Sequence, residues 1–276
     1  MPFDSWHGLR AGDQIGNLEY VVDEGALAQY RRVVGADGCF PNLMAEDCRS
    51  MLVQRGAGEP LTTVWQRLEF MRPPITGRRV QVGGWVRDVG EKCGQAWIRA
   101  AAFAVDEIGT EIMRSEAAFV IGREAAPLEQ SVETTEVAPV TASLARGRAG
   151  DSAHLGELRL PDGEQLNDFR RMASAMAGID TTLDSNRLTS VTAGWLESLM
   201  STNFGEDFRW GGRLSIAHHA AVPPGMELRC DGVTLGHDTD VNGVETRRIA
   251  IAVRDAAGYR VATAEAVVKS PSPLRA

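Results

Sequence analysis

The sequence predicts an α+β fold built from two similar halves, each with a long helix packed against a curled antiparallel sheet. Two observations support this prediction. A succession of short strand, two helices and several long strands occurs twice along the 276 residues. Turn sequences rich in glycine and proline separate the strand-like stretches, as expected for antiparallel neighbours.

The first helix of each half shows an apolar stripe at helical spacing, after a short strand. A Tyr-Arg-Arg sequence in the first helix matches Phe-Arg-Arg in the second, at an offset of 139 residues (169 − 30). This agreement in position indicates a repeated unit. The stripe residues are Leu27, Tyr30 and Val34 in residues 19–34, and Leu166, Phe169 and Met172 in residues 158–173.

A second helix follows in each half, expected at residues 41–54 and 190–203. In residues 41–54 an early proline is compatible with a helix start, and Leu43, Cys48, Met51 and Leu52 are available for burial. Proline-rich breaks at residues 72–77 and 221–225 then precede the strands. We expect strands at residues 80–89, 96–105 and 111–121 in the first half, and at 227–235, 245–253 and 260–268 in the second.

The halves are predicted to span residues 1–122 and 153–276, with residues 123–152 as the linker because they show no clear period. A long central helix against a curled antiparallel sheet is the hot-dog arrangement. Two such halves can pair side by side into one sheet, which hides the edge strand that each alone would expose. The alternative is two independent α+β domains without a shared sheet. We favour the joined form, a tandem (double) hot-dog.

Composition limits the classes of partner. The formal net charge of −8 argues against nucleic acid and against an anionic membrane, because both attract positive surfaces. The four cysteines show neither a CxxC pair nor a histidine at zinc-ligand spacing, so we expect no disulfide framework, no metal and no cofactor. The N-terminus lacks a basic start with an apolar run, and a cytoplasmic location is expected.

The second half resembles MaoC-type acyl-thioester hydratases over nearly its whole length. The resemblance rests on residues 194–200, which are similar to the start of that family's central helix, on the following strand at 211–216, and on the Val-Pro-Pro-Gly turn at 222–225. The first half resembles the fatty-acid-synthase-type dehydratase domain that often precedes it, through Arg72-Pro73 and residues 90–94.

This resemblance implies addition of water to an enoyl thioester, or its removal from a 3-hydroxyacyl thioester. The family uses an Asp and a His from a D-x-N-P-x-H signature in the loop before the central helix. One group holds the water or hydroxyl while the other exchanges a proton at the neighbouring carbon. The N-terminus of the central helix stabilises the enolate oxygen. In two-half members the first half commonly forms the acyl tunnel.

The corresponding loop here, residues 178–189, departs from the signature. In one alignment Asp184 and Asn186 fit, whereas Thr189 replaces the histidine. In the other, Asp180 matches an acidic residue after the missing histidine, and Gly178 occupies the histidine position. Both alignments therefore lack the loop histidine.

Each candidate has a functional and a structural interpretation. Asp184 or Asp180 would be the surviving acid or base, or else a solvated loop or cap residue. Asn186 would orient a substrate hydroxyl, or form a turn. Thr189, or Ser190 beside it, would contact substrate or cap the helix. Gly194 would let a ligand approach the backbone at the helix start, or allow close helix packing.

The adjacent histidines His218 and His219 lie on a predicted strand, so their side chains point to opposite faces and at most one faces a pocket beneath the sheet. We expect His219 to be the candidate that supplies the missing proton carrier. The alternative is a hydrogen-bonded histidine on a half-buried strand. In the first half, Asp37 alone is a weak candidate.

The preferred functional hypothesis is a hydratase or dehydratase-type lyase acting on an acyl thioester carried by CoA or acyl-carrier protein. Its candidate residues are Asp184, Asp180 and His219 for catalysis, and Asn186, Gly194 and Thr189 for substrate binding. Two alternatives are a hot-dog thioesterase or specialised pathway enzyme, and a non-catalytic subunit of a hot-dog hetero-oligomer. We expect a homo-oligomer, or a hetero-oligomer with another hot-dog protein.

Overall fold

The repeated order of elements is confirmed in the computed structural model, which describes residues 8–35, 41–55, 61–92, 95–122, 149–178, 188–239 and 243–269. The first half contains β1 (Gln14–Val21), α1 (Glu24–Val34), α2 (Pro41–Arg55), β2 (Leu61–Phe70), β3 (Arg79–Lys92), β4 (Gln95–Asp106) and β5 (Glu111–Ile121). The second half contains β6 (Ser152–Arg159), α3 (Gly163–Ala177), α4 (Leu188–Phe204), α5 (Glu206–Arg209), β7 (Arg213–His218), β8 (Glu227–Thr239), β9 (Glu245–Asp255) and β10 (Arg260–Lys269).

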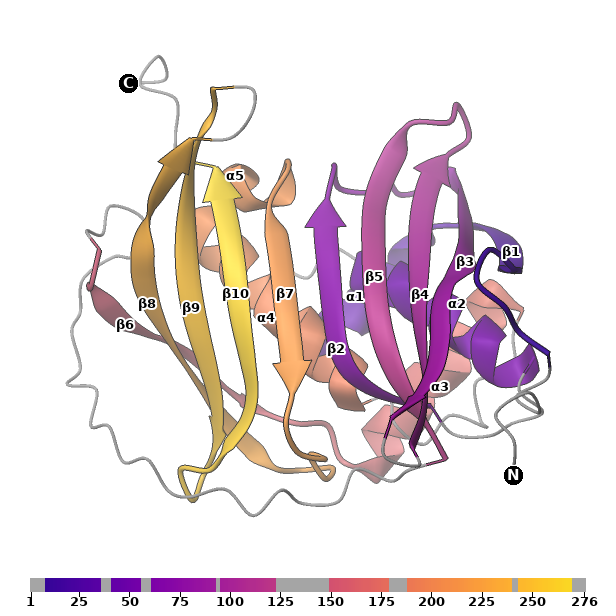
Figure 1. Cartoon of the computed structure of the whole chain (residues 1–276). Helices are drawn as coiled ribbons and strands as arrows, with labels where there is room; N and C mark the ends of the chain where they lie inside the picture. Colours follow the sequence, from indigo (N-terminus) through magenta and orange to yellow (C-terminus); the bar gives the residue numbers. More distant parts are fainter. Residues whose placement is uncertain are drawn as a thin grey trace.

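All ten strands form one antiparallel sheet, in the order β1-β3-β4-β5-β2-β7-β10-β9-β8-β6. The order is symmetric about the β2–β7 pair, since each strand of one half has its counterpart at the same distance on the other side. The helices lie together on one face of the sheet (Figure 1). The joined form is therefore confirmed, and two independent sheets are excluded.

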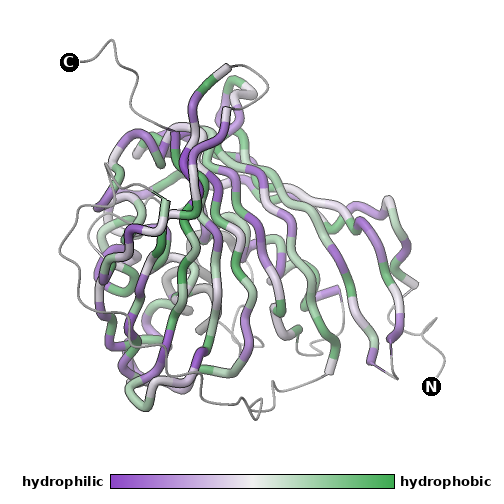
Figure 2. The backbone as a smooth tube through the Cα atoms, turned by 60° about the vertical axis from the view of Figure 1, so that its left-hand side comes forward, coloured by the Kyte–Doolittle hydropathy of each residue, from purple (hydrophilic) through white to green (hydrophobic). Residues whose placement is uncertain are grey.

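The strands bury alternate residues, because successive side chains point to opposite faces of a sheet. In β9, Ile249, Ile251 and Val253 are at most 3% exposed, whereas the alanines between them are more accessible. Figure 2 shows hydrophobic and hydrophilic residues alternating along the strands. We call the side that packs against the helices the inner face of the sheet, and the opposite side the outer face.

The central helices α2 and α4 are enclosed between the inner face and the other helices. The predicted burial of Leu43, Cys48, Met51 and Leu52 is confirmed. Helix α2 also buries polar side chains, among them Glu46, Asp47 and Arg49. A helix buried all round requires these groups to find partners inside the protein.

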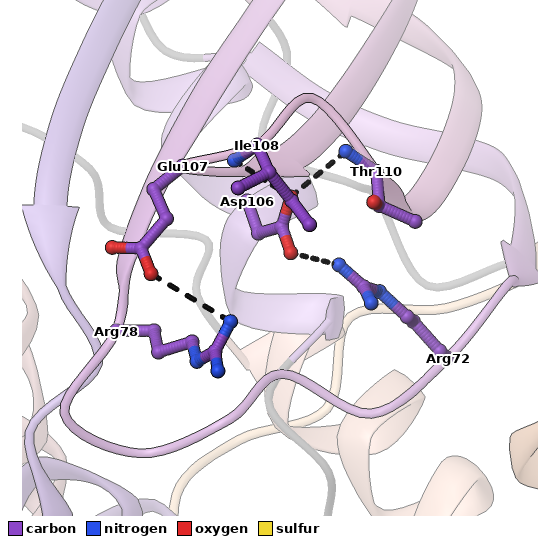
Figure 3. Close-up of polar contacts among 6 residues, drawn as sticks. All are labelled: Arg72, Arg78, Asp106, Glu107, Ile108 and Thr110. Carbon is purple, nitrogen blue, oxygen red and sulfur yellow. Dashed lines mark hydrogen bonds and ion pairs between the residues drawn. The ribbon is translucent and has the colours of Figure 1, made fainter.

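Hydrogen bonds and ion pairs, here called the polar clasp, connect the β4–β5 turn with the segment between β2 and β3 (Figure 3). Asp106, at the end of β4, accepts hydrogen bonds from the N–H groups of Ile108 (3.1 Å) and Thr110 (2.8 Å). Its carboxylate also pairs with Arg72, which precedes the proline break, and Arg78 lies 3.6 Å from Glu107. The clasp holds the β4–β5 turn against the segment that leads from β2 to β3.

Across the described ranges, no helix combines the length and the apolar character needed to cross a membrane.

Candidate functional site

A group of polar side chains occupies the inner face of the sheet at the seam, where β2 of one half pairs with β7 of the other. On β2, Thr63 and Gln66 are each 2% exposed. On β7, His218 follows Leu214 and Ile216, which are fully buried on the same face. Buried polar residues in the middle of a sheet are unusual, and here three of them gather at one pair of strands. Thr234 and Arg247 are also buried on the inner face, but on β8 and β9.

The strand register brings these side chains close together. Gln66 is opposite Ile216 and Trp65 is opposite Ala217, so His218 lies diagonally from Gln66. Between Thr63 and Trp65 the β2–β5 pairing shifts by one residue. Such a bulge redirects the side chains beside it. Thr63 thereby shares the inner face with Gln66.

Helix α2 adds an ion pair to the same region. Arg49 is 1% exposed, and its Nε lies 2.8 Å from Glu46 Oε2. Its Nη1 donates a 2.8 Å hydrogen bond to the carbonyl oxygen of Leu61, at the start of β2. The pair is thus fixed to the strand that carries Thr63 and Gln66. We call Glu46, Arg49, Thr63, Gln66 and His218 the seam cluster.

His218 is held as a neutral imidazole. Burial lowers its pKa from 6.5 to about 4, and the charges of His219 and Arg49 contribute in the same direction. Within the described part of the chain, Thr63 Oγ1, Gln66 Oε1 and His218 Nε2 are buried without a hydrogen-bond partner. Because buried polar atoms are normally satisfied, these three atoms suggest a place for water or a polar ligand.

A second polar contact joins α4 to α1. Tyr30 donates a 3.3 Å hydrogen bond through its hydroxyl to Glu197, which is fully buried. Gly194 lies one turn earlier on α4, where an added Cβ would stand 2.5 Å from Tyr30 Oη and 2.8 Å from Val34 Cγ1. Gly35, at the end of α1, approaches Ser198 in the same way. Small and polar residues therefore let α1 and α4 approach closely.

The residues predicted from the loop are only partly placed. Asp37, Asp180, Asp184 and Asn186 lie outside the described residues, as does the side chain of Thr189. Gly178 ends α3 in a left-handed conformation, with φ 64°.

The predicted start of α4 is corrected. The helix begins at Leu188, so Thr189 and Ser190 lie inside its first turn rather than at the N-cap. No proline or glycine stands at residues 188–190 to prevent the earlier start. Gly194 consequently lies in the second turn, packed on α1, and not at the helix end.

The two histidines point to opposite faces, as predicted, but the one on the inner face is His218 and not the predicted His219. His219 is paired through Nε2 with Thr263 Oγ1 at 2.8 Å. Thr263 belongs to the outer face, because its neighbours Ala262 and Ala264 are buried. The histidine beneath the sheet is His218. Its alternation with Leu214 and Ile216 was the sequence signal that favoured it over His219.

The seam cluster offers an uncharged imidazole, a carboxamide and a hydroxyl at the junction of the two halves. A neutral imidazole can accept a proton from water or donate a hydrogen bond. The Gln66 and Thr63 side chains are suited to hold a hydroxyl group in place. The arrangement is compatible with proton transfer to or from a small polar group.

Comparison with protein-family models gave no match, and no curated protein matches the sequence. Solved structures do match, over nearly the whole chain. A protein described as a MaoC-like dehydratase superposes with a TM-score of 0.67 at 14% identity, covering 98% of this chain and 100% of the other. A conserved hypothetical protein of Mycobacterium tuberculosis, described as having a double hotdog fold, gives a TM-score of 0.63 at 13% identity, with 97% and 98% covered.

A putative MaoC domain dehydratase from Chloroflexus aurantiacus gives a TM-score of 0.63 at 12% identity, covering 96% of this chain and 97% of that one. These identities establish similarity of fold. Together with the symmetric sheet and the enclosed central helices, they show that the chain has the double hot-dog fold found in proteins described as MaoC-like dehydratases.

Proposed function

We propose that this protein is a hydro-lyase that adds water to an enoyl thioester, or removes it from a 3-hydroxyacyl thioester. The observation that carries the proposal is the seam cluster, in which three buried polar atoms lack partners in the part of the structure described. The double hot-dog fold, shared with proteins named as dehydratases, is the appropriate setting.

In this proposal His218 takes the part of the histidine that the loop lacks. Its neutral ring exchanges a proton with the substrate, and Gln66 and Thr63 hold the water or hydroxyl. Asp180 or Asp184 supplies the second acid or base from the loop that leads into α4, with Asn186 orienting the hydroxyl. Helix α4, which this loop precedes in the sequence, contacts β7, the strand that carries His218.

The test is hydration of enoyl-CoAs of increasing chain length, from crotonyl-CoA upward, followed by the loss of enone absorbance. His218→Gln should lower kcat by about 10²-fold or more, because the proton carrier is removed. His219→Gln is the matched control, since this neighbour lies on the outer face, and it should retain activity. Equal activity of both variants would refute the role of His218.

The complete absence of hydration across the chain lengths would refute the lyase function itself. The same CoA esters assayed for release of free thiol separate this function from thioester hydrolysis. Asp180→Asn and Asp184→Asn, made separately, identify which loop carboxylate takes part. If either Asp variant lost hydration activity while His218→Gln stayed fully active, the lyase function would stand. The second proton carrier would then be a residue other than His218.

The pH dependence gives a further prediction. The pKa of His218 is about 4 in the folded protein, so the ring stays neutral from pH 8 down to about pH 5. We expect kcat to show no decrease near the ordinary histidine value of 6.5, and an acidic limb close to pH 4. A pH–rate profile of kcat, with stability monitored at each pH, measures this. A limb centred at 6.5 would contradict the neutral-histidine mechanism.

A further inference from the structure

The outer face of the sheet differs between the halves. In the first half it carries four aromatic rings, all partly exposed: Trp65, Trp85, Trp97 and Phe103. Strands β7 to β10, which form the equivalent face of the second half, contain no phenylalanine, tyrosine or tryptophan. Because the strand plans of the halves correspond, the fold alone does not require these rings.

Two of the rings lie against glycines of the neighbouring strand. A Cβ on Gly83 would stand 2.7 Å from Phe103 Cζ, and one on Gly90 would stand 2.6 Å from Trp97 Cζ2. Arg87 and Arg99 cover the rings of Trp85 and Trp65, at 5.2 and 5.9 Å from their centroids. The rings are therefore fixed in place, and a hollow of about 490 Å³ remains beside Trp85 and Phe103.

Charges of alternating sign cross the same face. Arg67 on β2 is opposite Glu116 on β5, and Glu69 is opposite Arg114. Trp65 is opposite Ala118 in the next outward position. Along this row of the sheet Glu69 is followed on β7 by Arg213, and Arg114 is followed on β4 by Phe103. On β2 and β5, each of these outward residues thus has a complementary partner on the other strand.

This pattern has a geometric consequence. Consider a two-fold axis that runs parallel to the strands, in the plane between two stacked sheets and over the gap between β2 and β5. This axis places each residue of β2 in the second copy over its cross-strand partner on β5 of the first copy. In a second copy related by this axis and stacked face to face, Arg67 faces Glu116 and Glu69 faces Arg114. Trp65 faces the small Ala118. Opposite charges and one large-to-small pair therefore meet across β2 and β5, as a symmetric interface requires.

We propose that a second copy of this chain packs on the outer face of β4, β5, β2 and β7, about this axis. Sheets packed face to face lie about 10 Å apart, a separation that long side chains from both sheets can fill. The second copy's Arg213 then reaches Phe103 at the edge of the hollow. Exposed aromatic rings and arginines, which dominate such interfaces, occur together on this face.

The experiment measures the mass of the full chain in solution by sedimentation, over a range of concentrations. The wild type should be dimeric at micromolar concentrations. Arg67→Glu places like charges opposite Glu116 and should raise the dimer dissociation constant at least about tenfold. Combining Arg67→Glu with Glu116→Arg restores opposite charges across the axis and should restore the dimer. Circular dichroism verifies that each variant is folded.

Arg248→Glu is the matched control. Arg248 forms an exposed bidentate pair with Glu265 on the outer face of the second half, outside the proposed interface. This variant should remain dimeric. Arg213→Glu provides an independent test on β7 and should weaken the dimer. A monomeric wild type, a dimer indifferent to Arg67→Glu, or a double variant that stays monomeric would each overturn the proposal.

Discussion

Gly194 has a structural task that depends on its lack of a side chain. Alanine at this position would press its Cβ against Tyr30 and Val34, and α1 would have to move away from α4. We expect Gly194→Ala to lower the free energy of unfolding by about 1–3 kcal/mol, as overpacking commonly does. Chemical denaturation of the two proteins measures the difference.

Gly163→Ala is the control for this substitution. Gly163 begins α3, and an added Cβ there meets no atom within 4 Å. This variant should be neutral or slightly stabilising, because alanine favours a helix over glycine. If both variants had the same stability, the close approach of α1 and α4 would not be the reason for a glycine at 194.

Asp106 makes the stability depend on acid. Its partial burial alone would raise the pKa, but the hydrogen bonds from Thr110, Arg72 and Ile108, with the charge of Arg72, lower it below 3.8. A carboxylate whose pKa is lower in the folded state than in the unfolded state contributes its full stabilisation above pH 3.8. This contribution disappears as the pH falls further, through the pKa of the folded state.

Asp106→Asn should therefore have a lower Tm than the wild type at neutral pH. Its Tm should also fall by a smaller amount on acidification. Thermal melts between pH 7 and pH 3 measure both effects. Glu107→Gln, which weakens only the exposed contact with Arg78, should melt like the wild type. A parallel acid loss in Asp106→Asn and the wild type would show that other carboxylates dominate the transition.

The seam cluster could be predicted from the sequence only in part. The alternation Leu214, Ile216, His218 indicates that His218 faces inward, but the prediction chose His219 instead. Gln66 and Thr63 were not predicted as site residues, because their position depends on pairing between strands of different halves. That pairing requires the tertiary fold, and the bulge after Thr63 shifts the side-chain pattern of β2.

At the scale of elements, α3 illustrates how local sequence sets a boundary. Asp162 caps the helix through hydrogen bonds from Glu164 N (3.0 Å) and Gln165 N (2.9 Å), and the Gln165 side chain accepts a hydrogen bond from the Asp162 N–H in return. Asp162→Ala should lower the free energy of unfolding by about 1 kcal/mol, because two helical N–H groups lose their acceptor.

Asp168→Ala on the same helix is the comparison for the cap. Asp168 forms an exposed pair with Arg171, and such pairs contribute little to stability. Urea unfolding of both variants distinguishes them, and equal losses would mean that the capping box does not govern the stability of α3.

Most elements were predictable because their signals are local. The strands expected at residues 80–89, 96–105, 111–121, 245–253 and 260–268 match β3, β4, β5, β9 and β10. β5 has the predicted bounds, and the other four are somewhat longer in the structure. Strand β2 was not among the strands predicted with bounds. Its run of Thr62, Thr63 and Gln66 lacks an apolar alternation, since the polar seam replaces it. The short helix α5 was also missed.

For the whole molecule, the β2–β7 pairing is the connection on which both halves depend. Separately produced residues 1–122 and 153–276 would expose β2 or β7 as an open edge with unpaired backbone groups. We expect each half alone to self-associate or aggregate, and the two produced together to form a complex with equal numbers of both halves and the same mass as the uncut protein. Size-exclusion chromatography with light scattering measures these masses.

A full chain cut at a protease site inserted within residues 123–148 is the control, and under native conditions it should keep the mass of the uncut protein. Two monomeric halves, each unfolding cooperatively, would contradict the view that the seam completes the fold.

The symmetric order of the sheet also implies a history. Strands β2 and β7 are equivalent elements of the two repeats, and they meet antiparallel, as the same strand would across the axis of a homodimer of half-length chains. After duplication and fusion of such a chain, the two copies of this strand can change independently. His218 on β7 and the Thr63–Gln66 segment on β2 are then the diverged descendants of one ancestral strand. One strand of the pair now carries a buried histidine and the other a buried threonine and glutamine, so the two sides of the seam are no longer equivalent.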